Sequence, residues 1–416
     1  MQRLSTLNRQ FTTDSNFNGG KVGAKRDDDI VIIGLARTAM TKAKRGPQRN
    51  TGVEAMLKPV LQAVHKQSGV DKALVDDIVI GNVILPGSAA TNHRMASLLA
   101  DYPETTSVMA INRLCSSGLQ AVGTVANAIR ANQIQVGIGG GVESMSTGNM
   151  QTTVDVNMLS EEIYDHEVAR DCLIPMGITS DNVAAQYGIT RAQQDQLAVD
   201  SHAKALHSNK MGWSQSEITP YKTKVQDKDG NETEVLVDHD DGPREGTTLE
   251  KLGKLKPAFQ KGGSTTAGTS SQMTDGAAAV MLTTRGVANK LGSKIIGRFV
   301  GYATAGVPPK VMGIGPAFAI PKALENCGLD MNQIDVFEIN EAFASQATYS
   351  VQKLGVPKEK LNPRGGALAV GHPLGMTGAR MIVTLMSELE RTDKKFGIVS
   401  MCIGTGMGAA GVFERE

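Results

Sequence analysis

A weak internal repeat is the feature of this sequence that most constrains its fold. The segment Gly69-Val70-Asp71 recurs as Gly328-Leu329-Asp330, and the offset of 259 residues still holds from Ile80 to Ile339. Two further matches follow in the same order, at offsets of 257 and 260: Cys115–Gly118 with His372–Gly375, and Val136–Ile138 with Phe396–Ile398. A repeat this long indicates duplicated domains rather than a solenoid of short units.

Short apolar runs alternate with stretches of helical periodicity along the chain. The predicted strands are Ile30–Ile33, Asp77–Ile80, Gln135–Ile138, Val336–Ile339 and Gly397–Met401. The predicted helices are Gly52–Gln67, Ser117–Asn132, Asp181–Tyr187 and Gly378–Glu388. This alternation predicts an α/β fold in which helices pack on sheets.

The repeat also divides the chain. We expect a leader (1–28), an N-terminal half (29–146 with 274–294), an insertion (147–273) and a C-terminal half (295–416). The insertion is polar and holds the hairpin turn Asp227–Gly230 before Thr233–Val237. Because long insertions on a rigid scaffold commonly carry binding, we expect it to cover a site.

Composition excludes several classes of protein. The net charge of +1 argues against nucleic acid or an anionic membrane as the main partner. No apolar run reaches the roughly 18 residues of a membrane span. The four cysteines are widely spaced, without the short spacing of a zinc site, which favours free thiols in a reducing compartment.

The leader has an unusual composition. Residues 1–25 are rich in Ser, Thr, Asn and Gly, and Leu4, Leu7 and Phe11 share one helical face. An amphipathic, acid-poor start is typical of a targeting segment. A frayed terminus or a cloning remnant gives the same composition.

Cys115 and His372 occupy twin positions in the repeat, each at a strand-to-helix junction. The positive end of a helix favours the thiolate form of Cys115, although a single cysteine is more often a buried structural residue. If the halves pack about a pseudo-twofold axis, both helix starts point into one cleft. His372 would then take the proton of the Cys115 thiol.

Two other segments follow predicted strands. Cys402 begins the glycine-rich loop through Gly404, Gly406 and Gly408, whose N–H groups suit a negatively charged oxygen. The spacing does not match a dinucleotide-binding loop, and no second strand with an acidic residue follows. Asn340 lies at the carboxyl end of a strand, where site residues are common, but asparagine also caps helices.

Together these segments resemble the thiolases, from about residue 29 to the C-terminus. The motifs are Asn112–Gly118, Gly141–Met145, Asn340–Ala344, Gly371–Pro373 and Cys402–Gly406. The resemblance implies an α/β, thiolase-like fold: two duplicated βαβ-type halves in α/β/α/β/α layers, with an inserted loop domain. It also implies cleavage or formation of 3-ketoacyl-CoA through an acyl-enzyme.

The resemblance assigns roles to five residues. Cys115 corresponds to the acylated nucleophile and His372 to its base. Cys402 corresponds to the thiol that moves protons to and from the substrate α-carbon. Asn340 corresponds to the residue that holds a water beside the enolate, and the N–H groups of Cys115 and Gly404 correspond to the oxyanion hole. CoA and acyl-CoA are substrates in this chemistry, which requires no metal and no permanently bound cofactor.

In the insertion, Arg244 and Ser271 correspond to family positions that contact CoA, although Arg244 alone is also an ordinary surface charge. Met176 is the third residue predicted to contact CoA. Thr269 stands where the family usually has asparagine, and Met376 where relatives carry Cys or Ala. Four methionines lie in or beside the motifs, and either line an acyl pocket or pack in the core: Met145, Met176, Met376 and Met407.

The segment Cys172–Thr179 resembles the version in peroxisomal 3-ketoacyl-CoA thiolases. Arg3-Leu4 and Gln10-Phe11 resemble an N-terminal peroxisomal targeting signal, which implies an import receptor as partner; a mitochondrial presequence is the alternative. The family likeness implies at least a homodimer. An acetoacetyl-CoA thiolase and a non-catalytic acyl-CoA-binding protein remain alternative functions.

Overall fold

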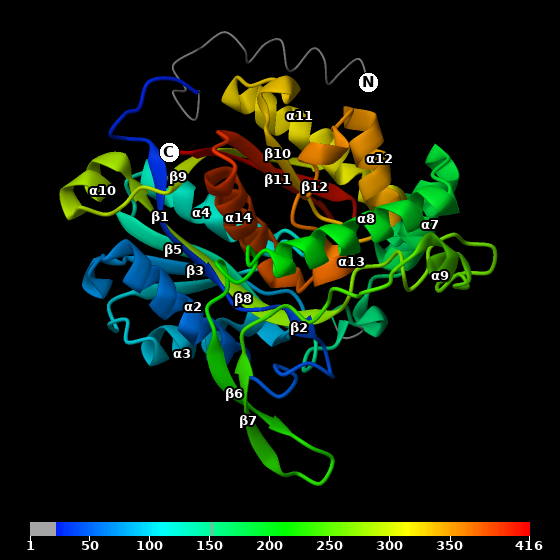
Figure 1. Ribbon diagram of the computed structural model, residues 1–416, viewed down its shortest axis with the longest axis horizontal. Coiled ribbons are helices and arrows are strands. Elements are labelled where there is room, and N and C mark those ends of the chain that lie inside the picture. Colours follow the sequence, from blue (N-terminus) through cyan, green and yellow to red (C-terminus); the bar gives the residue numbers. More distant parts are fainter. Residues whose placement is uncertain (1–21, 151–152) are drawn as a thin grey trace.

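The computed structural model describes residues 22–150 and 153–416. Within these residues ten strands form one continuous hydrogen-bonded sheet (Figure 1). These strands are β1 (Ile30–Arg37), β2 (Thr41–Lys42), β3 (Asp77–Gly81), β4 (Ser107–Ile111), β5 (Val136–Ser144), β8 (Thr274–Thr284), β9 (Gly297–Gly306), β10 (Val336–Ile339), β11 (Phe396–Ile403) and β12 (Met407–Arg415). Their order is β10-β11-β12-β9-β1-β8-β5-β3-β4, with β2 beside β8. Because β1 and β9 pair only at Val31 and Ile32, this narrow junction separates an N-terminal from a C-terminal sheet.

The two sheets repeat the same strand pairing. In the N-terminal sheet β3 runs parallel to β5, with Asp77 opposite Gly137. In the C-terminal sheet β10 runs parallel to β11, with Val336 opposite Gly397. These positions are related by the offsets found in the sequence, so the predicted duplication is confirmed at the level of register.

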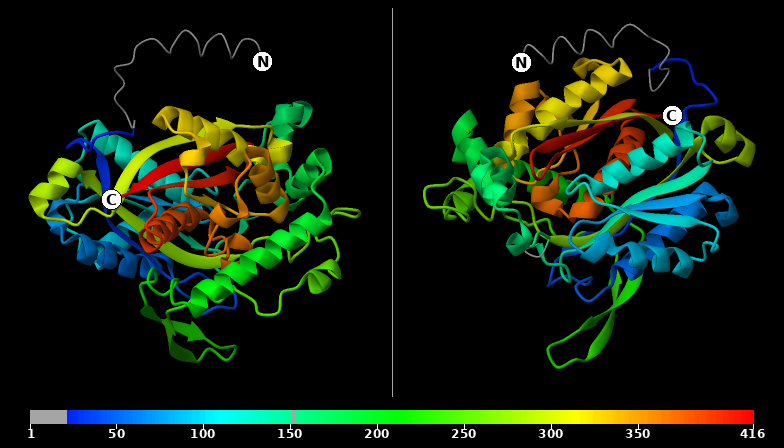
Figure 2. Two further views of the ribbon diagram at one scale, coloured as in Figure 1. Left: turned by 45° about the horizontal axis from the view of Figure 1, so that its top comes forward. Right: turned by 180° about the vertical axis from the view of Figure 1, so that it is seen from behind.

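Helices cover both sheets and fill the space between them (Figures 1 and 2). Helices α2 and α3 pack on the outer side of the N-terminal sheet, α4 and α14 lie between the sheets, and α11 and α12 lie on the outer side of the C-terminal sheet. Their bounds are α2 (Val53–Ser68), α3 (Ala90–Leu99), α4 (Ser117–Arg130), α11 (Gly315–Cys327), α12 (Ala344–Leu354) and α14 (Leu374–Arg391). The chain therefore forms five layers, α/β/α/β/α, as predicted.

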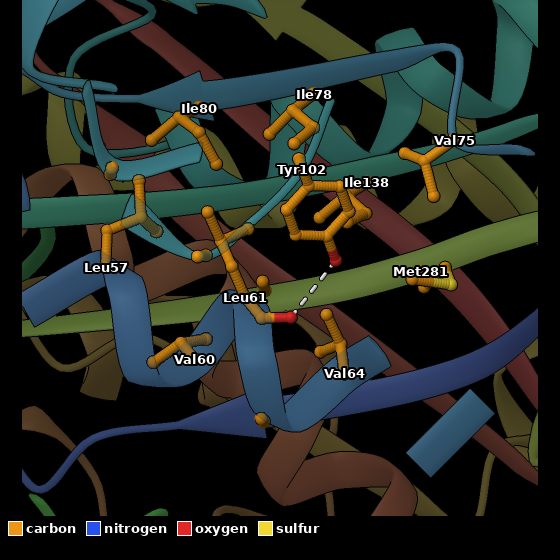
Figure 3. Packing of buried hydrophobic residues seen from close by; sticks show 14 of the residues in the cluster. Leu57, Val60, Leu61, Val64, Val75, Ile78, Ile80, Tyr102, Ile138 and Met281 are labelled. Atoms are coloured by element: carbon orange, nitrogen blue, oxygen red, sulfur yellow. Dashed lines mark hydrogen bonds between the residues drawn. The ribbon is translucent and has the colours of Figure 1, made fainter. Parts of the chain in front are cut away.

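The outer core of the N-terminal half shows why α2 docks where it does (Figure 3). The apolar face of α2 presents Leu57, Leu61 and Val64 to Ile78 and Ile138 of the sheet. Each buried aliphatic side chain of this kind contributes about 1.5–3 kcal/mol to folding. The hydroxyl of the buried Tyr102 donates to the Leu61 carbonyl at 3.1 Å, so its polar atom is satisfied.

The central layer brings the two halves into backbone contact. A Cβ atom on Gly141 of β5 would lie 1.9 Å from the Gly375 carbonyl oxygen at the start of α14. A Cβ atom on Gly118, near the start of α4, would lie 2.6 Å from the same oxygen. These positions therefore require glycine, and they bring the N-terminal ends of α4 and α14 together.

The insertion contributes one long helix, shorter helices and a projecting hairpin (Figure 1). Its elements are α5 (Glu162–Asp165), α6 (Glu167–Arg170), α7 (Met176–Tyr187), α8 (Arg191–Lys210), α9 (Leu249–Gly253), β6 (Tyr221–Gln226) and β7 (Glu232–Val237). Two further short helices, α10 (Arg285–Leu291) and α13 (Ala367–Val370), lie outside the insertion. The predicted turn at 227–230 joins β6 to β7. No helix in the described ranges is long and apolar enough to cross a membrane.

Candidate active site

A pocket of about 560 Å³ lies where both halves meet the insertion. Cys115 comes from the N-terminal half and His372 from the C-terminal half, and both line this pocket. The insertion supplies much of the remaining wall, including Met150, Ile174, Phe259 and Gln272. The structure thus brings the predicted cysteine and histidine into one cavity, and residues from the segment 147–273 line it.

Cys115 lies in the tight turn between β4 and α4. Leu114 has a φ of 48° and α4 begins at Ser117, so the thiol lies just before the first helical turn. Burial raises the pKa of Cys115 to about 11, although the backbone N–H groups of Gly404 and Cys115 act in the opposite direction. In the free protein desolvation of the charged form is therefore a larger effect on this pKa than the N–H groups that favour the thiolate.

His372 is oriented through its Nδ1 atom, which lies 2.6 Å from the Thr377 hydroxyl. That hydroxyl donates to the Pro373 carbonyl at 2.9 Å and so accepts the Nδ1 proton. Nε2 is therefore left unprotonated, as a base requires, and its lone pair accepts from the Asn340 side-chain amide. Burial, and then the charge of Arg380, lowers the pKa of His372 to about 3, so the imidazole is neutral near pH 7.

Asn340 and Cys402 complete the cluster from the ends of β10 and β11. The Asn340 Nδ2 atom lies 3.3 Å from His372 Nε2, and within the described residues its Oδ1 atom has no hydrogen-bond partner. Cys402 is fully buried beside Met312 and Ala342. Burial, and then the neighbouring Cys115, raises the pKa of Cys402 well above its ordinary value, so this thiol holds its proton.

The positions proposed for CoA do not all lie in the pocket wall. Ser271 and Met176 line it, whereas Arg244 is exposed outside the wall. The Arg244 guanidinium reaches the Gln272 side chain at 3.4 Å, and Gln272 does line the pocket. Arg244 is therefore at the rim of the pocket.

The structure also places the residues that depart from the family. Met376 is fully buried with Met40 and Ala278, so it packs in the core and does not reshape the pocket. Met145 and Met176 line the pocket. Thr269 is buried, and its hydroxyl accepts from the Thr266 N–H at 2.8 Å, which gives this threonine a local structural role.

Sequence reasoning missed two residues that hold His372. Thr377 follows the motif Gly371–Pro373, and its position in the first turn of a helix after a histidine was a usable signal. Gln272 had none: its carbonyl accepts the His372 N–H at 2.9 Å, a contact made only by the folded chain. Within residues 22–150 and 153–416, no group of three or more potential metal ligands gathers. The predicted targeting signal lies outside the described residues.

The raised pKa of Cys115 predicts how alkylation depends on pH. We expect the rate of Cys115 alkylation by iodoacetamide to rise about tenfold per unit from about pH 6 to about pH 9, because only the thiolate reacts and its population increases throughout this range. Peptide mass spectrometry assigns the label to Cys115. A rate that is already constant below pH 8 would instead indicate a preformed thiolate–imidazolium pair.

Comparison with known proteins agrees with this geometry. The model of the thiolase N-terminal domain matches residues 30–286, and that of the thiolase C-terminal domain matches residues 293–415. The chain is 52% identical over 416 residues to the peroxisomal 3-ketoacyl-CoA thiolase of Yarrowia lipolytica, with both chains fully covered. It is 50% identical over 387 residues to the human peroxisomal enzyme, covering 93% of this chain and 91% of the other.

Solved structures show the same fold. The dimeric peroxisomal thiolase of Saccharomyces cerevisiae superposes with a TM-score of 0.87 and 45% identity, over 94% of this chain and 99% of the other. The Bacillus anthracis acetyl-CoA acetyltransferase gives 0.85 and 36%, over 94% and 100%. With both halves matched by family models and a relative aligned over its full length, the chain belongs to the thiolase family.

Proposed function

We propose that the chain is a 3-ketoacyl-CoA thiolase of fatty-acid β-oxidation. It uses CoA to cleave a 3-ketoacyl-CoA into acetyl-CoA and an acyl-CoA shorter by two carbons. The observation that carries this proposal is the meeting of Cys115 and His372, from opposite halves, in one pocket beside Cys402. The names of the similar proteins from Yarrowia lipolytica and human support the same reaction.

The first half-reaction transfers the shortened acyl group to the enzyme. His372 Nε2 takes the proton of Cys115, and the sulfur attacks the C3 carbonyl carbon of the substrate. The bond between C2 and C3 then breaks, leaving an acyl thioester on Cys115 and the enolate of acetyl-CoA. Cys402 donates its proton to C2 of this enolate, and acetyl-CoA leaves.

The second half-reaction returns the enzyme to its starting state. The Cys402 thiolate takes the proton of an incoming CoA thiol, and the CoA sulfur attacks the acyl carbonyl on Cys115. The Cys115 sulfur leaves and recovers its proton from His372. The N–H groups of Cys115 and Gly404 would stabilise the oxyanion at the acyl carbonyl, and Asn340, through a water held with His372, would stabilise the thioester enolate.

The substrates are the only small molecules this scheme requires: CoA and acyl-CoA. Ser271 and Met176 in the wall would contact the pantetheine arm, and Arg244 at the rim would stack on or pair with the nucleotide end. Val154, Val156 and Ile174 are apolar residues of the pocket wall, against which the acyl chain would lie.

The cellular setting is proposed on the same basis. The similar proteins from Yarrowia lipolytica, human and Saccharomyces cerevisiae are named peroxisomal, and the last is described as dimeric. We place this chain in the peroxisome as a homodimer, directed there by an import receptor that recognises Arg3-Leu4 and Gln10-Phe11. The division into a leader, two halves and an insertion at the boundaries given above is part of this proposal.

The alternative function is that of an acetoacetyl-CoA thiolase, and the likeness to the acetyl-CoA acetyltransferase is the observation in its favour. Thiolysis rates across a series of acyl chain lengths distinguish the proposed function from this alternative. We expect kcat/KM to be at least about tenfold higher for 3-ketodecanoyl-CoA than for acetoacetyl-CoA, since each buried methylene contributes about 0.8 kcal/mol. Val156→Asp should lower the rate with the ten-carbon substrate and leave the four-carbon rate within about threefold. A preference for acetoacetyl-CoA would support the alternative function.

A further inference from the structure

Glu143 is a buried carboxylate at the contact between the two halves, and it takes no part in either half-reaction. It lies next to the end of β5 and is fully buried. Four donors surround it: the Gly375 N–H (2.8 Å) and Val83 N–H (3.0 Å) at Oε2, and the Asn82 side-chain amide (2.9 Å) and Ile84 N–H (3.3 Å) at Oε1. Burial raises the pKa of Glu143 to about 7, and these donors favour the charged form.

The contact with Gly375 supplies a cap that α14 lacks. The N-cap position of α14 is Pro373, whose side chain has no hydrogen-bonding atom. The first N–H groups of a helix need acceptors from outside the helix, and a carboxylate is favoured there by the helix dipole. Glu143, from the opposite half of the chain, accepts from Gly375 and so fills this role.

The same carboxylate fixes both sides of the reaction centre. Gly375 lies in the chain between His372 and Thr377, and the hydroxyl of Thr377 holds the His372 imidazole in place. On the other side, Val83 and Ile84, whose N–H groups bind Glu143, belong to the hydrophobic cluster against which Cys115 packs. A change in this carboxylate would therefore alter the position of His372 relative to Cys115.

We propose that Glu143 is a positioning residue for the reaction: it caps α14 across the interface between the halves and sets the distance between imidazole and thiol. This inference rests on the proposed function. A failure of that function would appear as a wild-type enzyme inactive on every 3-ketoacyl-CoA. A failure of the inference would appear as a Glu143 variant that is as active as the wild type.

Glu143→Gln is the decisive variant. Both carboxylate oxygens accept hydrogen bonds, so the NH₂ group of a glutamine would face donors on one side and lose their hydrogen bonds. We expect kcat for thiolysis to fall about 100-fold with KM within about threefold, since misplacing a reacting group by about 1 Å costs a factor of this size. Glu143→Asp keeps the charge but shortens the reach, so its kcat should lie between those of the glutamine variant and the wild type.

Glu388→Gln is the matched control. Glu388 is also buried on α14, but it binds Arg364 and Arg391, and none of these three residues lines the active-site pocket. The control should lower the melting temperature and leave kcat within about threefold. The inference is overturned if Glu143→Gln and Glu143→Asp both keep kcat within threefold, or if kcat follows melting temperature equally in the Glu143 and Glu388 variants.

Discussion

Replacing Cys115 with alanine is expected to lower thiolysis by more than about 10⁴-fold, because the variant has no atom on which the acyl group can be held. Intact-protein mass spectrometry after incubation with acyl-CoA should show an acyl adduct on the wild type and none on Cys115→Ala. Thiolysis is measured on the same samples by the loss of 3-ketoacyl-CoA. Binding of CoA should persist in the variant, since the rest of the pocket wall is unchanged.

Cys172 provides the matched control, because it lines the same pocket and is also partly accessible. Its sulfur lies 3.9 Å from the carbonyl oxygens of Val168 and Thr405, and the repeat gives it no histidine partner. Cys172→Ala should therefore still acquire the adduct on Cys115. An adduct that maps to Cys172, or more than a tenth of the wild-type rate in Cys115→Ala, would contradict the assigned nucleophile.

The repeat made the central geometry predictable from sequence. Nearly equal sequence offsets between the two halves imply the same strand pairing in each half. The structure repeats even a hydrogen bond from the start of one strand to an aspartate just before its neighbouring strand. Asp76 Oδ2 accepts from Gln135 N–H at 2.7 Å, and Asp335 Oδ2 accepts from Lys395 N–H at 3.0 Å. Because Cys115 and His372 hold twin positions in this frame, two strand-to-helix junctions that meet in the middle layer bring them into one pocket.

The ionisation of these groups was not predictable from sequence. A helix terminus favours a thiolate, but the degree of desolvation depends on how the insertion and both halves close over the sulfur. The direction in which the Met376 side chain points was also not predictable from the sequence. It lies next to Thr377, and only the helix phase set by the packing of α14 sends one side chain into the core and the other to His372.

Cys402→Ala is expected to separate the two kinds of bond cleavage. A thiolate leaving group needs no acid near neutral pH, so the variant should still be acylated on Cys115 by a saturated acyl-CoA. Cleavage of a 3-ketoacyl-CoA releases a carbanion equivalent that must be protonated at carbon, and it should fall about 10³-fold. The raised pKa of Cys402 suits this task, because the thiol keeps its proton until the enolate forms.

The measurement compares the rate of adduct formation from acyl-CoA with the rate of thiolysis of a 3-ketoacyl-CoA. Cys402→Ser is the matched variant: it restores a polar hydrogen at this position, but its hydroxyl is too weak an acid at carbon, so it should share the loss. If Cys402→Ala keeps thiolysis within tenfold, the proton at C2 has another source. If both rates fall together, Cys402 serves the shape of the pocket rather than proton transfer.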